Sequence, residues 1–272
     1  MSELIYFQHT INYYKYGNGP SLLFAFHGFA DNADLFQNLG EVLSPYFTLI
    51  SIDLPFHGKT KWEGDIYKPE DIYQILNLLM VKYNFTSCSM ICHSMGGRII
   101  WALLSMMPAQ INNLIFLAPA GFQYTFTASR FWCPMWFRRR ARKKFEESEG
   151  ILRFFDMAHK LKLMNRATYL VFKQQLDLPR RRARLLKTWI SMYFFPMGAK
   201  KKHRNIINDH AIKCFFFYGI KDRITPAKCA NKFVSQLKNT EICLLKGNHF
   251  FVRDNLAPQL KIWLNDNSDS LK

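Results

Sequence analysis

Ser94 is the residue of this 272-residue chain whose surroundings most clearly indicate chemistry. It lies in the segment 92–97, CHSMGG, between an apolar run and a stretch with helical spacing. A serine on a tight strand-to-helix turn needs small neighbours, because the strained backbone leaves little room. Gly96 and Gly97 meet this need, whereas Cys92 stands where the G-x-S-x-G pattern has its first glycine, so we expect a slightly looser turn. The alternative is that Ser94 only caps the helix that follows it.

A serine becomes a useful nucleophile only when a base takes its proton and an acid holds that base. His249 follows an apolar segment, and active sites of open parallel sheets lie at the carboxyl ends of the strands. His27 and His57 also follow apolar segments but precede the serine, and His93 is adjacent to Ser94 and cannot easily turn back onto it. The other histidines lie in a central insert, in an early hairpin or before a strand: His9, His159, His203 and His210. His249 is therefore the predicted base.

Two aspartates could supply the acid. Asp222, in YGIKDRITP, follows an apolar segment near the end of the chain, and Asp53, in SIDLPFHG, follows another near its start. Asp222 could instead form a turn or cap a helix beside Thr225-Pro226. The spacing alone leaves these alternatives open.

The elements that must position these residues alternate between strands and helices. A hairpin is expected over 4–19, ending at the glycine turn 17–19. Short apolar runs predict buried strands at 21–28, 47–55, 87–93, 111–121, 211–222 and 240–249. Helical spacing predicts helices at 34–43, 69–83, 97–107, 226–237 and 256–265. This alternation predicts an α/β fold with an open, mostly parallel sheet covered by helices on both faces.

The charge divides the chain into two parts. The net charge is +17, and residues 122–205 hold 21 of the 37 Lys and Arg but only 5 of the 20 Asp and Glu. The remainder of the chain is nearly neutral. We therefore predict a core formed by 1–121 and 206–272, interrupted by a basic, aromatic-rich helical insertion at 122–205, with helices at 136–149 and 182–193.

Other features limit the class of protein. With 49% hydrophobic residues, the chain is not expected to be disordered. No uninterrupted apolar run reaches about 18 residues, and the first residues lack the pattern of a secretory signal, so neither a membrane span nor secretion is expected. The six scattered cysteines form no CxxC pair and are expected to be reduced thiols of a cytoplasmic protein.

The order Ser94, Asp222, His249 resembles that of the α/β-hydrolase family. Further motifs match over 21–121 and 211–265: His27-Gly28-Phe29, the D-x-P-x-H-G loop 53–58, the elbow 93–97, Gly219-x-x-Asp222 and Asn248-His249-Phe250. Phe56 replaces a common glycine of the 53–58 loop. The fold that the resemblance implies is an α/β-hydrolase fold with a helical cap in the insertion.

The resemblance also implies a two-step acyl transfer. Ser94 would attack a carbonyl carbon, His249 would accept its proton, and Asp222 would orient the imidazole. The backbone N–H groups of Phe29 and Met95 would form the oxyanion hole. Asp53 would be structural. The serine disfavours epoxide hydrolases and haloalkane dehalogenases, which attack with an aspartate at this position, and no metal or organic cofactor is implied.

The expected substrate is a carboxylic ester with a lipophilic acyl group. Candidate contacts with it are His27 and three aromatic residues of the insertion, Phe122, Trp132 and Trp136. A thioesterase or a C–C bond hydrolase of the same fold is an alternative with the same triad. A second alternative, kept open by Cys92 and Phe56, is a catalytically silent protein that binds a lipid or a membrane.

Clusters of Lys and Arg mark the insertion at 138–144, 180–184 and 200–204. They could form a solvated surface, bind an acidic substrate, or bring the protein to an anionic membrane surface beside apolar aromatic residues. The expected location is therefore the cytoplasm, with peripheral contact at the inner membrane surface as a further option. The same charge could bind nucleic acid, but no nucleic-acid-binding module is recognisable and no nucleic acid is expected as a partner.

Overall fold

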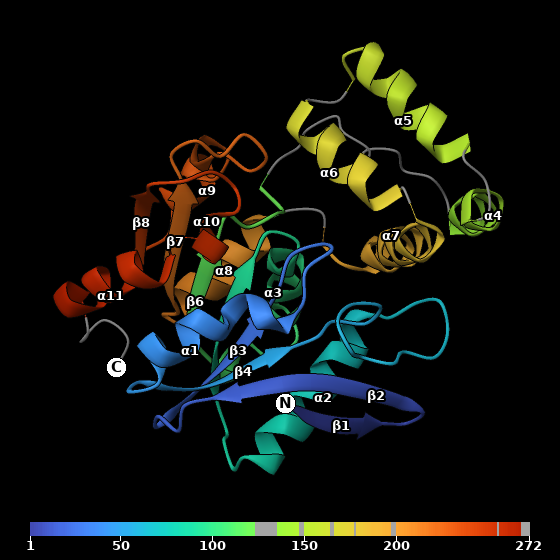
Figure 1. Ribbon diagram of the computed structural model, residues 1–272. Helices are drawn as coiled ribbons and strands as arrows, with labels where there is room; N and C mark the ends of the chain where they lie inside the picture. Colours follow the sequence, from blue (N-terminus) through green and yellow to red (C-terminus); the bar gives the residue numbers. More distant parts are fainter. Residues whose placement is uncertain are drawn as a thin grey trace.

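The computed structural model describes residues 1–122, 135–146, 150–163, 166–176, 178–196, 200–254 and 256–267. Its centre is an eight-stranded sheet with the strand order β1-β2-β4-β3-β5-β6-β7-β8 (Figure 1). The strands are β1 (Ser2–Tyr6), β2 (His9–Tyr16), β3 (Ser21–Phe26), β4 (Phe47–Ile52), β5 (Cys88–His93), β6 (Ile111–Leu117), β7 (Lys213–Gly219) and β8 (Thr240–Leu245).

The strand pairs from β4 to β8 are parallel, and only the pairs β1–β2 and β2–β4 are antiparallel. Every residue of β4 and β5 is buried, as expected for strands covered on both faces. Helices α1 (Gln37–Leu43) and α11 (Leu256–Asn267) lie side by side on one face (Figure 1). Helices α2 (Pro69–Lys82), α3 (Gly96–Leu104) and α8 (Lys201–Asp209) lie on the other. The predicted α/β architecture is confirmed.

The early hairpin turns at a different place from the one predicted. β1 and β2 are joined by Phe7 and Gln8, because the register pairs Tyr6 with His9. Phe7 takes the positive φ of 51° that a two-residue loop demands. The glycine turn at 17–19 instead connects β2 to β3. A Cβ on Gly19 would lie 2.3 Å from the backbone nitrogen of Phe47, so this glycine permits a close approach of two chain segments.

The predicted helix over 226–237 is also divided. It consists of the 3₁₀ helix η4 (Ala227–Cys229) and the short helix α9 (Asn231–Val234). Hydrogen bonds from Cys229 N to the Pro226 carbonyl and from Ala230 N to the Ala227 carbonyl tighten its first turn. The other short elements are η1 (Ala33–Phe36), η2 (Pro108–Gln110), η3 (Met192–Phe194) and α10 (Phe251–Asp254).

Four helices between β6 and β7 stand beside the sheet rather than on it (Figure 1). They are α4 (Met135–Glu146), α5 (Gly150–Lys160), α6 (Arg166–Leu176) and α7 (Pro179–Ser191). The predicted helices at 136–149 and 182–193 overlap α4 and α7, whereas α5 and α6 were not predicted. Leu176, Leu185 and Leu186 form a small apolar cluster of their own, and Phe29 of the core packs against it.

Both ends of the predicted insertion lie with the core. Phe122 packs against Trp101, with ring centroids 5.3 Å apart, and against Phe216. At the other end, the predicted boundary at 205/206 falls inside α8, which packs on α3. Among the described residues, no helix is both long and apolar enough to span a membrane.

Candidate active site

Ser94 lies on a strained turn between β5 and α3. Its φ is 48°, a left-handed conformation that non-glycine residues rarely adopt. The turn is held by Ser94 N, which donates to the Leu117 carbonyl (3.1 Å), and by Ala120 N, which donates to the Ser94 carbonyl (2.7 Å). A Cβ on Gly96 would lie 2.3 Å from the Phe26 carbonyl oxygen, so only glycine fits there. The strained conformation is present although Cys92 replaces a glycine.

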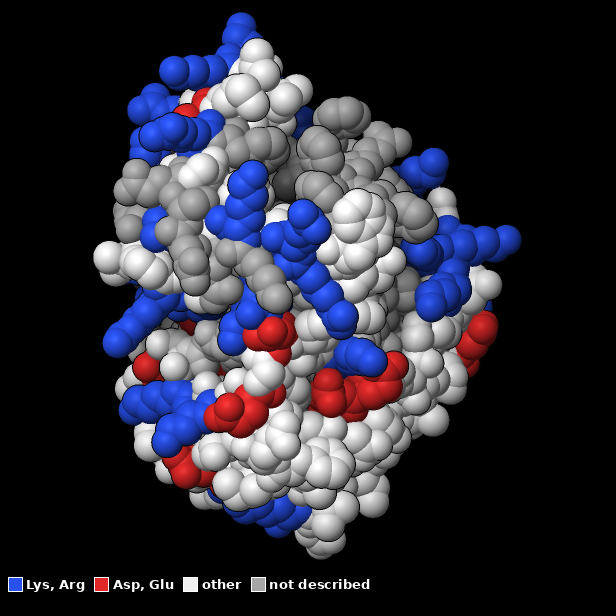
Figure 2. Space-filling model, turned by 90° about the vertical axis from the view of Figure 1, so that its right-hand side faces the viewer, with Lys and Arg blue, Asp and Glu red and all other residues white. Residues whose placement is uncertain are grey.

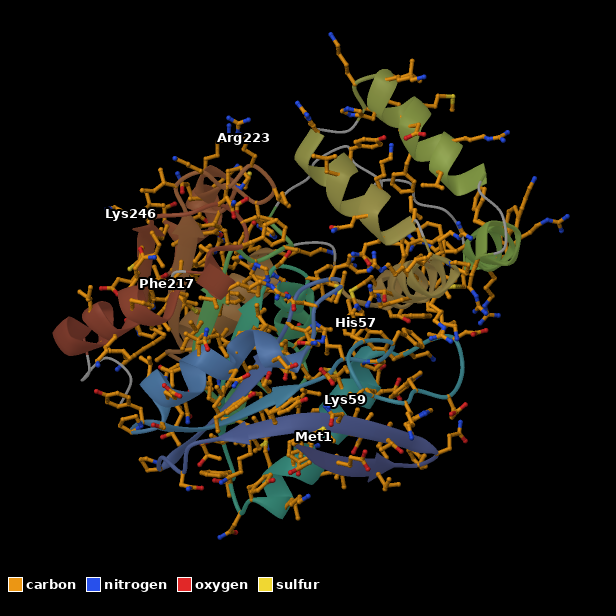
Figure 3. All side chains as sticks on the ribbon, in the orientation of Figure 1. Met1, His57, Lys59, Phe217, Arg223 and Lys246 are labelled. Carbon is orange, nitrogen blue, oxygen red and sulfur yellow. The ribbon has the colours of Figure 1, made fainter. Side chains whose placement is uncertain are left out.

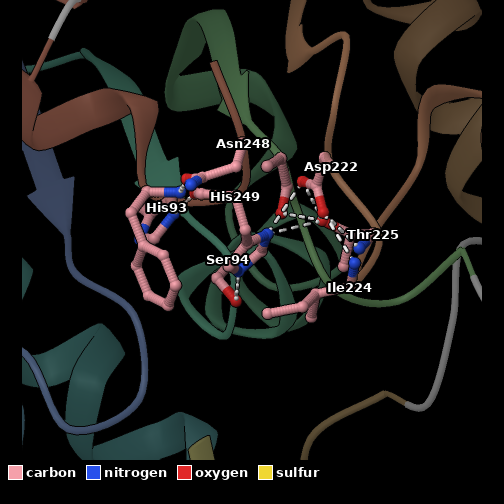
Figure 4. A network of polar contacts seen from close by, with 9 residues as sticks. His93, Ser94, Asp222, Ile224, Thr225, Asn248 and His249 are labelled. Carbon is pink, nitrogen blue, oxygen red and sulfur yellow. Dashed lines mark hydrogen bonds and ion pairs between the residues drawn. The ribbon is translucent and has the colours of Figure 1, made fainter. Parts of the chain in front are cut away.

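The structure brings Ser94, His249 and Asp222 into one chain of hydrogen bonds (Figure 4). His249 Nε2 lies 3.0 Å from Ser94 Oγ, and His249 Nδ1 lies 2.8 Å from Asp222 Oδ2. With the proton on Nδ1 donated to the carboxylate, Nε2 presents a lone pair to the serine hydroxyl. Ser94 is partly exposed, whereas His249 and Asp222 are buried. Ser94 follows β5, Asp222 follows β7 and His249 follows β8, so all three lie at the carboxyl ends of strands.

Asp222 is held as a carboxylate. Burial alone would raise its pKa, but the hydrogen bond and charge interaction with His249 and the N–H groups of Thr225 and Ile224 lower the pKa overall. Ile224 N and Thr225 N donate to Oδ1 at 2.8 Å and 2.9 Å, which leaves Oδ2 for His249. Asp222 therefore uses Oδ1 to cap the turn that follows it and Oδ2 to contact the imidazole of His249.

Asp53, the other candidate acid, has partners elsewhere. Its carboxylate accepts hydrogen bonds from Asn12 Nδ2 (2.7 Å), Ala33 N (2.7 Å) and Lys59 N (2.8 Å). It therefore ties β2 to the loops that follow β3 and β4. Asp53 thus has the geometry of a structural residue that holds these loops in place.

Thr225 is a part of the site that was not predicted from the sequence, where it was named only as a neighbour of a possible turn or cap at Asp222. Its Oγ1 lies 3.1 Å from His249 Nδ1, 3.1 Å from Asp222 Oδ2 and 2.9 Å from the carbonyl oxygen of Ala118. A hydroxyl has one proton to donate and two lone pairs. It can donate to either acceptor while it accepts from the imidazole N–H. The Asp-x-x-Thr spacing, typical of local side-chain caps, was the available signal.

His93 connects the elbow to the loop of His249. Its Nε2–H donates to the carbonyl oxygen of His249 at 3.0 Å, and the two rings lie 5.0 Å apart. Burial, and the nearby His249, lower the pKa of His93 to about 3, so the ring is neutral. No sequence signal indicated this link, because it depends on where the base loop returns to the sheet.

The remaining predicted site residues are distributed over different environments. Phe29 follows Gly28 at the end of β3, and Met95 precedes α3 directly after Ser94. His27 is fully buried, and both of its ring nitrogens are engaged, with the Gly28 carbonyl and with Leu54 N, so it braces the loops from inside.

The three predicted aromatic contacts are equally dispersed. Phe122 packs in the core, and Trp136 on α4 is 67% exposed. Trp132 lies outside the described residues. Within the described part of the chain, no three His, Cys, Asp or Glu side chains gather so as to hold a metal ion. The hydrogen-bonded serine, imidazole and carboxylate have the geometry for proton transfer from a hydroxyl nucleophile.

Comparison with known proteins identifies the family of the chain. Residues 21–256 match the family described as alpha/beta hydrolase fold, and the chain belongs to this family. It is 26% identical over 110 residues to a probable serine hydrolase of Drosophila melanogaster, across 36% of this chain and 31% of that protein. It is 30% identical over 120 residues to monoacylglycerol lipase ABHD6 of Rattus norvegicus, across 42% of this chain and 34% of that protein. The chain thus spans about a third of the length of these relatives.

Solved structures share the fold over nearly the whole chain. A structure from Nitrososphaera gargenis, from work on its carboxylesterases, is 19% identical and covers 98% of each chain with a TM-score of 0.68. An ancestral haloalkane dehalogenase is 17% identical and covers 99% of this chain and 100% of its own, with a TM-score of 0.64. One fold therefore supports different reactions, and the residues of the site must distinguish them.

The neutral His93 predicts a pH dependence of stability. Its pKa is about 3 in the folded protein, against about 6.5 for an unfolded histidine. In this pH range the folded state therefore binds fewer protons than the unfolded state. The contribution of neutral His93 to the stability of the folded protein is complete above about pH 6.5 and is lost as the pH falls towards 3. Between about pH 7.5 and about pH 5, this group should cost about 2 kcal/mol in the free energy of unfolding.

Urea unfolding of wild type and His93→Gln at these two pH values measures the difference. The variant should lose less stability on acidification by about this amount, whereas His210→Gln, at an exposed histidine, should behave as wild type. Equal pH dependence in wild type and His93→Gln would contradict the prediction.

Proposed function

We propose that the protein is a serine hydrolase that cleaves carboxylic esters through an acyl-enzyme on Ser94. The observation that carries the proposal is the hydrogen-bonded chain from Ser94 Oγ through His249 to Asp222, on a strained turn between β5 and α3. A serine at this position, in place of an aspartate, favours acyl transfer over displacement at a saturated carbon.

In the first half-reaction, Ser94 Oγ attacks the ester carbonyl carbon while its proton passes to His249 Nε2, 3.0 Å away. Asp222 stabilises the imidazolium, because its carboxylate is ionised and accepts from Nδ1. The tetrahedral intermediate collapses when His249 gives the proton to the leaving alcohol. Water then repeats the sequence on the acyl-enzyme, with His249 again as the base, and releases the acid.

The negative oxygen of the intermediate needs donors. We assign this role to the N–H groups of Met95, at the amino end of α3, and of Phe29, at the carboxyl end of β3. Gly28 allows the two segments to approach, since a Cβ there would lie 3.3 Å from Ser94 Cβ. Removal of one such donor typically costs about 10² to 10³ in rate.

Helices α4–α7 are proposed to form a cap that shapes a lipophilic substrate site. The support is the apolar cluster of Leu176, Leu185 and Leu186, which Phe29 joins from the core, and a relative that is named as a monoacylglycerol lipase. Because Phe122 and α8 pack with the core, the cap is proposed to begin after Phe122 and to end before α8.

The cap is further proposed to contact anionic membranes. Lys and Arg gather over the upper part of the molecule in Figure 2, while most Asp and Glu lie below. The exposed cations of this region include Arg139, Arg140, Lys144, Arg153, Lys160, Lys162, Arg166, Arg180 and Arg181. Exposed Trp136, Leu161 and Leu170 lie among them. Cations attract anionic head groups, and apolar side chains can insert between lipids.

The proposed compartment is the reducing cytoplasm. In the described part of the chain, Cys88, Cys92, Cys214 and Cys243 are free thiols. Free thiols are typical of proteins that are kept in reducing compartments.

Hydrolysis of p-nitrophenyl esters from acetate to palmitate tests the proposed reaction. Wild type should turn over the longer members best, and Ser94→Ala should lose roughly 10³-fold or more in kcat/KM. Ser105→Ala removes an exposed serine at the end of α3 and should retain full activity. A wild-type protein that neither hydrolyses any member nor reacts with a fluorophosphonate probe would be a silent binder.

Thr225 should act as a positioning residue for His249. Thr225→Val keeps the shape but removes the hydroxyl, and we expect kcat to fall roughly fivefold, because one hydrogen bond contributes about 1 kcal/mol. Thr225→Ser should restore most of the activity. A kcat in Thr225→Val equal to wild type, or no recovery in Thr225→Ser, would argue against this role.

Co-sedimentation with phosphatidylcholine vesicles, with and without phosphatidylserine, tests the membrane contact. Wild type should bind only the anionic vesicles at low salt, since exposed charges are screened by salt. Arg139→Glu/Arg140→Glu should bind much less, whereas Lys232→Glu/Lys238→Glu, with the same charge change on the core, should not. Absence of wild-type binding would remove this part of the proposal.

A further inference from the structure

Arg184 on α7 is a cation without an acidic partner in the described part of the chain. Its Nη2 donates to the neutral Gln175 Oε1 at 2.5 Å, and its buried Nε has no acceptor there. Burial, and the nearby Arg181, lower its pKa. Two neighbouring cations differ, because Arg142 and Lys187 both reach Asp65, at 2.5 Å and 3.3 Å. A partly buried guanidinium without a counter-charge calls for an anion.

This side of α7 lies over the loops next to Ser94. One turn after Arg184, Lys187 places Nζ 5.4 Å from the centre of the Phe56 ring. Phe29 packs against the α7 leucines and lies 6.0 Å from the His57 ring. In Figure 3, His57 lies on the side of the core that faces α7. Arg184 therefore lies on the same side of the site as the loop of Phe29, which follows β3.

The two histidines below Arg184 carry no compensating charge. His57 Nδ1–H donates to the Pro55 carbonyl (3.0 Å), so Nε2 of the neutral ring carries a lone pair. Among the described residues, no donor reaches this nitrogen. His27 uses both ring nitrogens internally. Burial lowers the pKa of both histidines, to which the charge of Arg184 contributes, so both are neutral. The Asp53 carboxylate accepts its hydrogen bonds from Asn12 Nδ2, Ala33 N and Lys59 N, which hold it among the loops of the core.

We infer that Arg184 binds a carboxylate carried by the substrate, so that the protein prefers esters with a free acid at the end remote from the scissile bond. A guanidinium edge matches the two oxygens of a carboxylate. A phosphate, with up to two charges and three oxygens, would need more hydrogen-bond donors than one arginine supplies. The neighbouring His57 cannot help to bind it, because its Nε2 is an acceptor. An O–H or N–H donor of the ligand, or a water, would suit His57 Nε2.

This inference rests on the proposed ester hydrolysis, and matched pairs of substrates separate the two. The acyl pair is p-nitrophenyl octanoate and the p-nitrophenyl monoester of suberic acid, which differ by a terminal carboxylate. The alcohol pair is phenyl octanoate and 4-carboxyphenyl octanoate. Ser94-dependent turnover of the neutral esters tests the proposed reaction. The ratio of kcat/KM, anionic over neutral, tests the role of Arg184.

In one of the two pairs, wild type should have a higher kcat/KM for the anionic ester, mainly because its KM is lower. Arg184→Gln should lower that ratio roughly tenfold or more, as for loss of one charge-assisted hydrogen-bonded pair. Arg180→Gln, with the same charge change at an exposed position of α7, should leave it as in wild type. No anionic preference in either pair, or the same ratio in Arg184→Gln as in wild type, would overturn the inference.

Binding to inactive protein provides a readout without turnover. Calorimetric titration of suberate and of 4-hydroxybenzoate into Ser94→Ala should detect one of them. Adding Arg184→Gln should abolish the binding, and adding Arg180→Gln should not. Neither ligand binding to Ser94→Ala, or equal binding with and without Arg184→Gln, would overturn the inference even if the neutral esters are hydrolysed.

Discussion

The left-handed backbone of Ser94 is the constraint on which the site depends. A φ of 48° directs the chain sharply from β5 into α3 and leaves no space for side chains around the turn. Glycine is required at position 96, because a Cβ would collide with the Phe26 carbonyl oxygen. It is also required at position 97, because a Cβ would lie 2.8 Å from the Ala120 carbonyl oxygen. The strain is tolerated because hydrogen bonds from neighbouring strand ends hold the turn. The serine hydroxyl is consequently presented above the sheet, where the loops after β7 and β8 can reach it.

Those loops are joined to one another by buried hydrogen bonds. Thr225 links the Asp222 loop to the Ala118 carbonyl beyond β6, and His93 links the elbow to the backbone of His249. Each bond pairs a buried polar group that would otherwise be costly to remove from water. The position of the imidazole is therefore set by three strand ends together and not by the Asp222–His249 contact alone.

The unequal charge of the two parts of the chain has a structural meaning. The core is nearly neutral, and residues 122–205 carry almost all of the net charge of +17. Most of the described cations of this region face solvent, where a charge costs little. A few turn towards the core, and Asp65 pairs with two of them, Arg142 and Lys187. Arg184 is distinguished from them by facing neutral histidines.

The sequence by itself determined the alternation of strands and helices, the basic insertion, and the candidate nucleophile and base, Ser94 and His249. These follow from local periodicity and from residue types, which need no knowledge of distant contacts. It could not choose between Asp222 and Asp53 without family resemblance, because both follow buried strands. Only the tertiary structure separates their contacts: Asp222 Oδ2 lies 2.8 Å from His249 Nδ1, and Asp53 is bound by Asn12, Ala33 and Lys59. The sequence also could not predict the contacts of Thr225 and His93 or the position of Arg184 over the loops. They arise where segments far apart in the chain meet, and the burial and partners of a side chain are properties of that meeting.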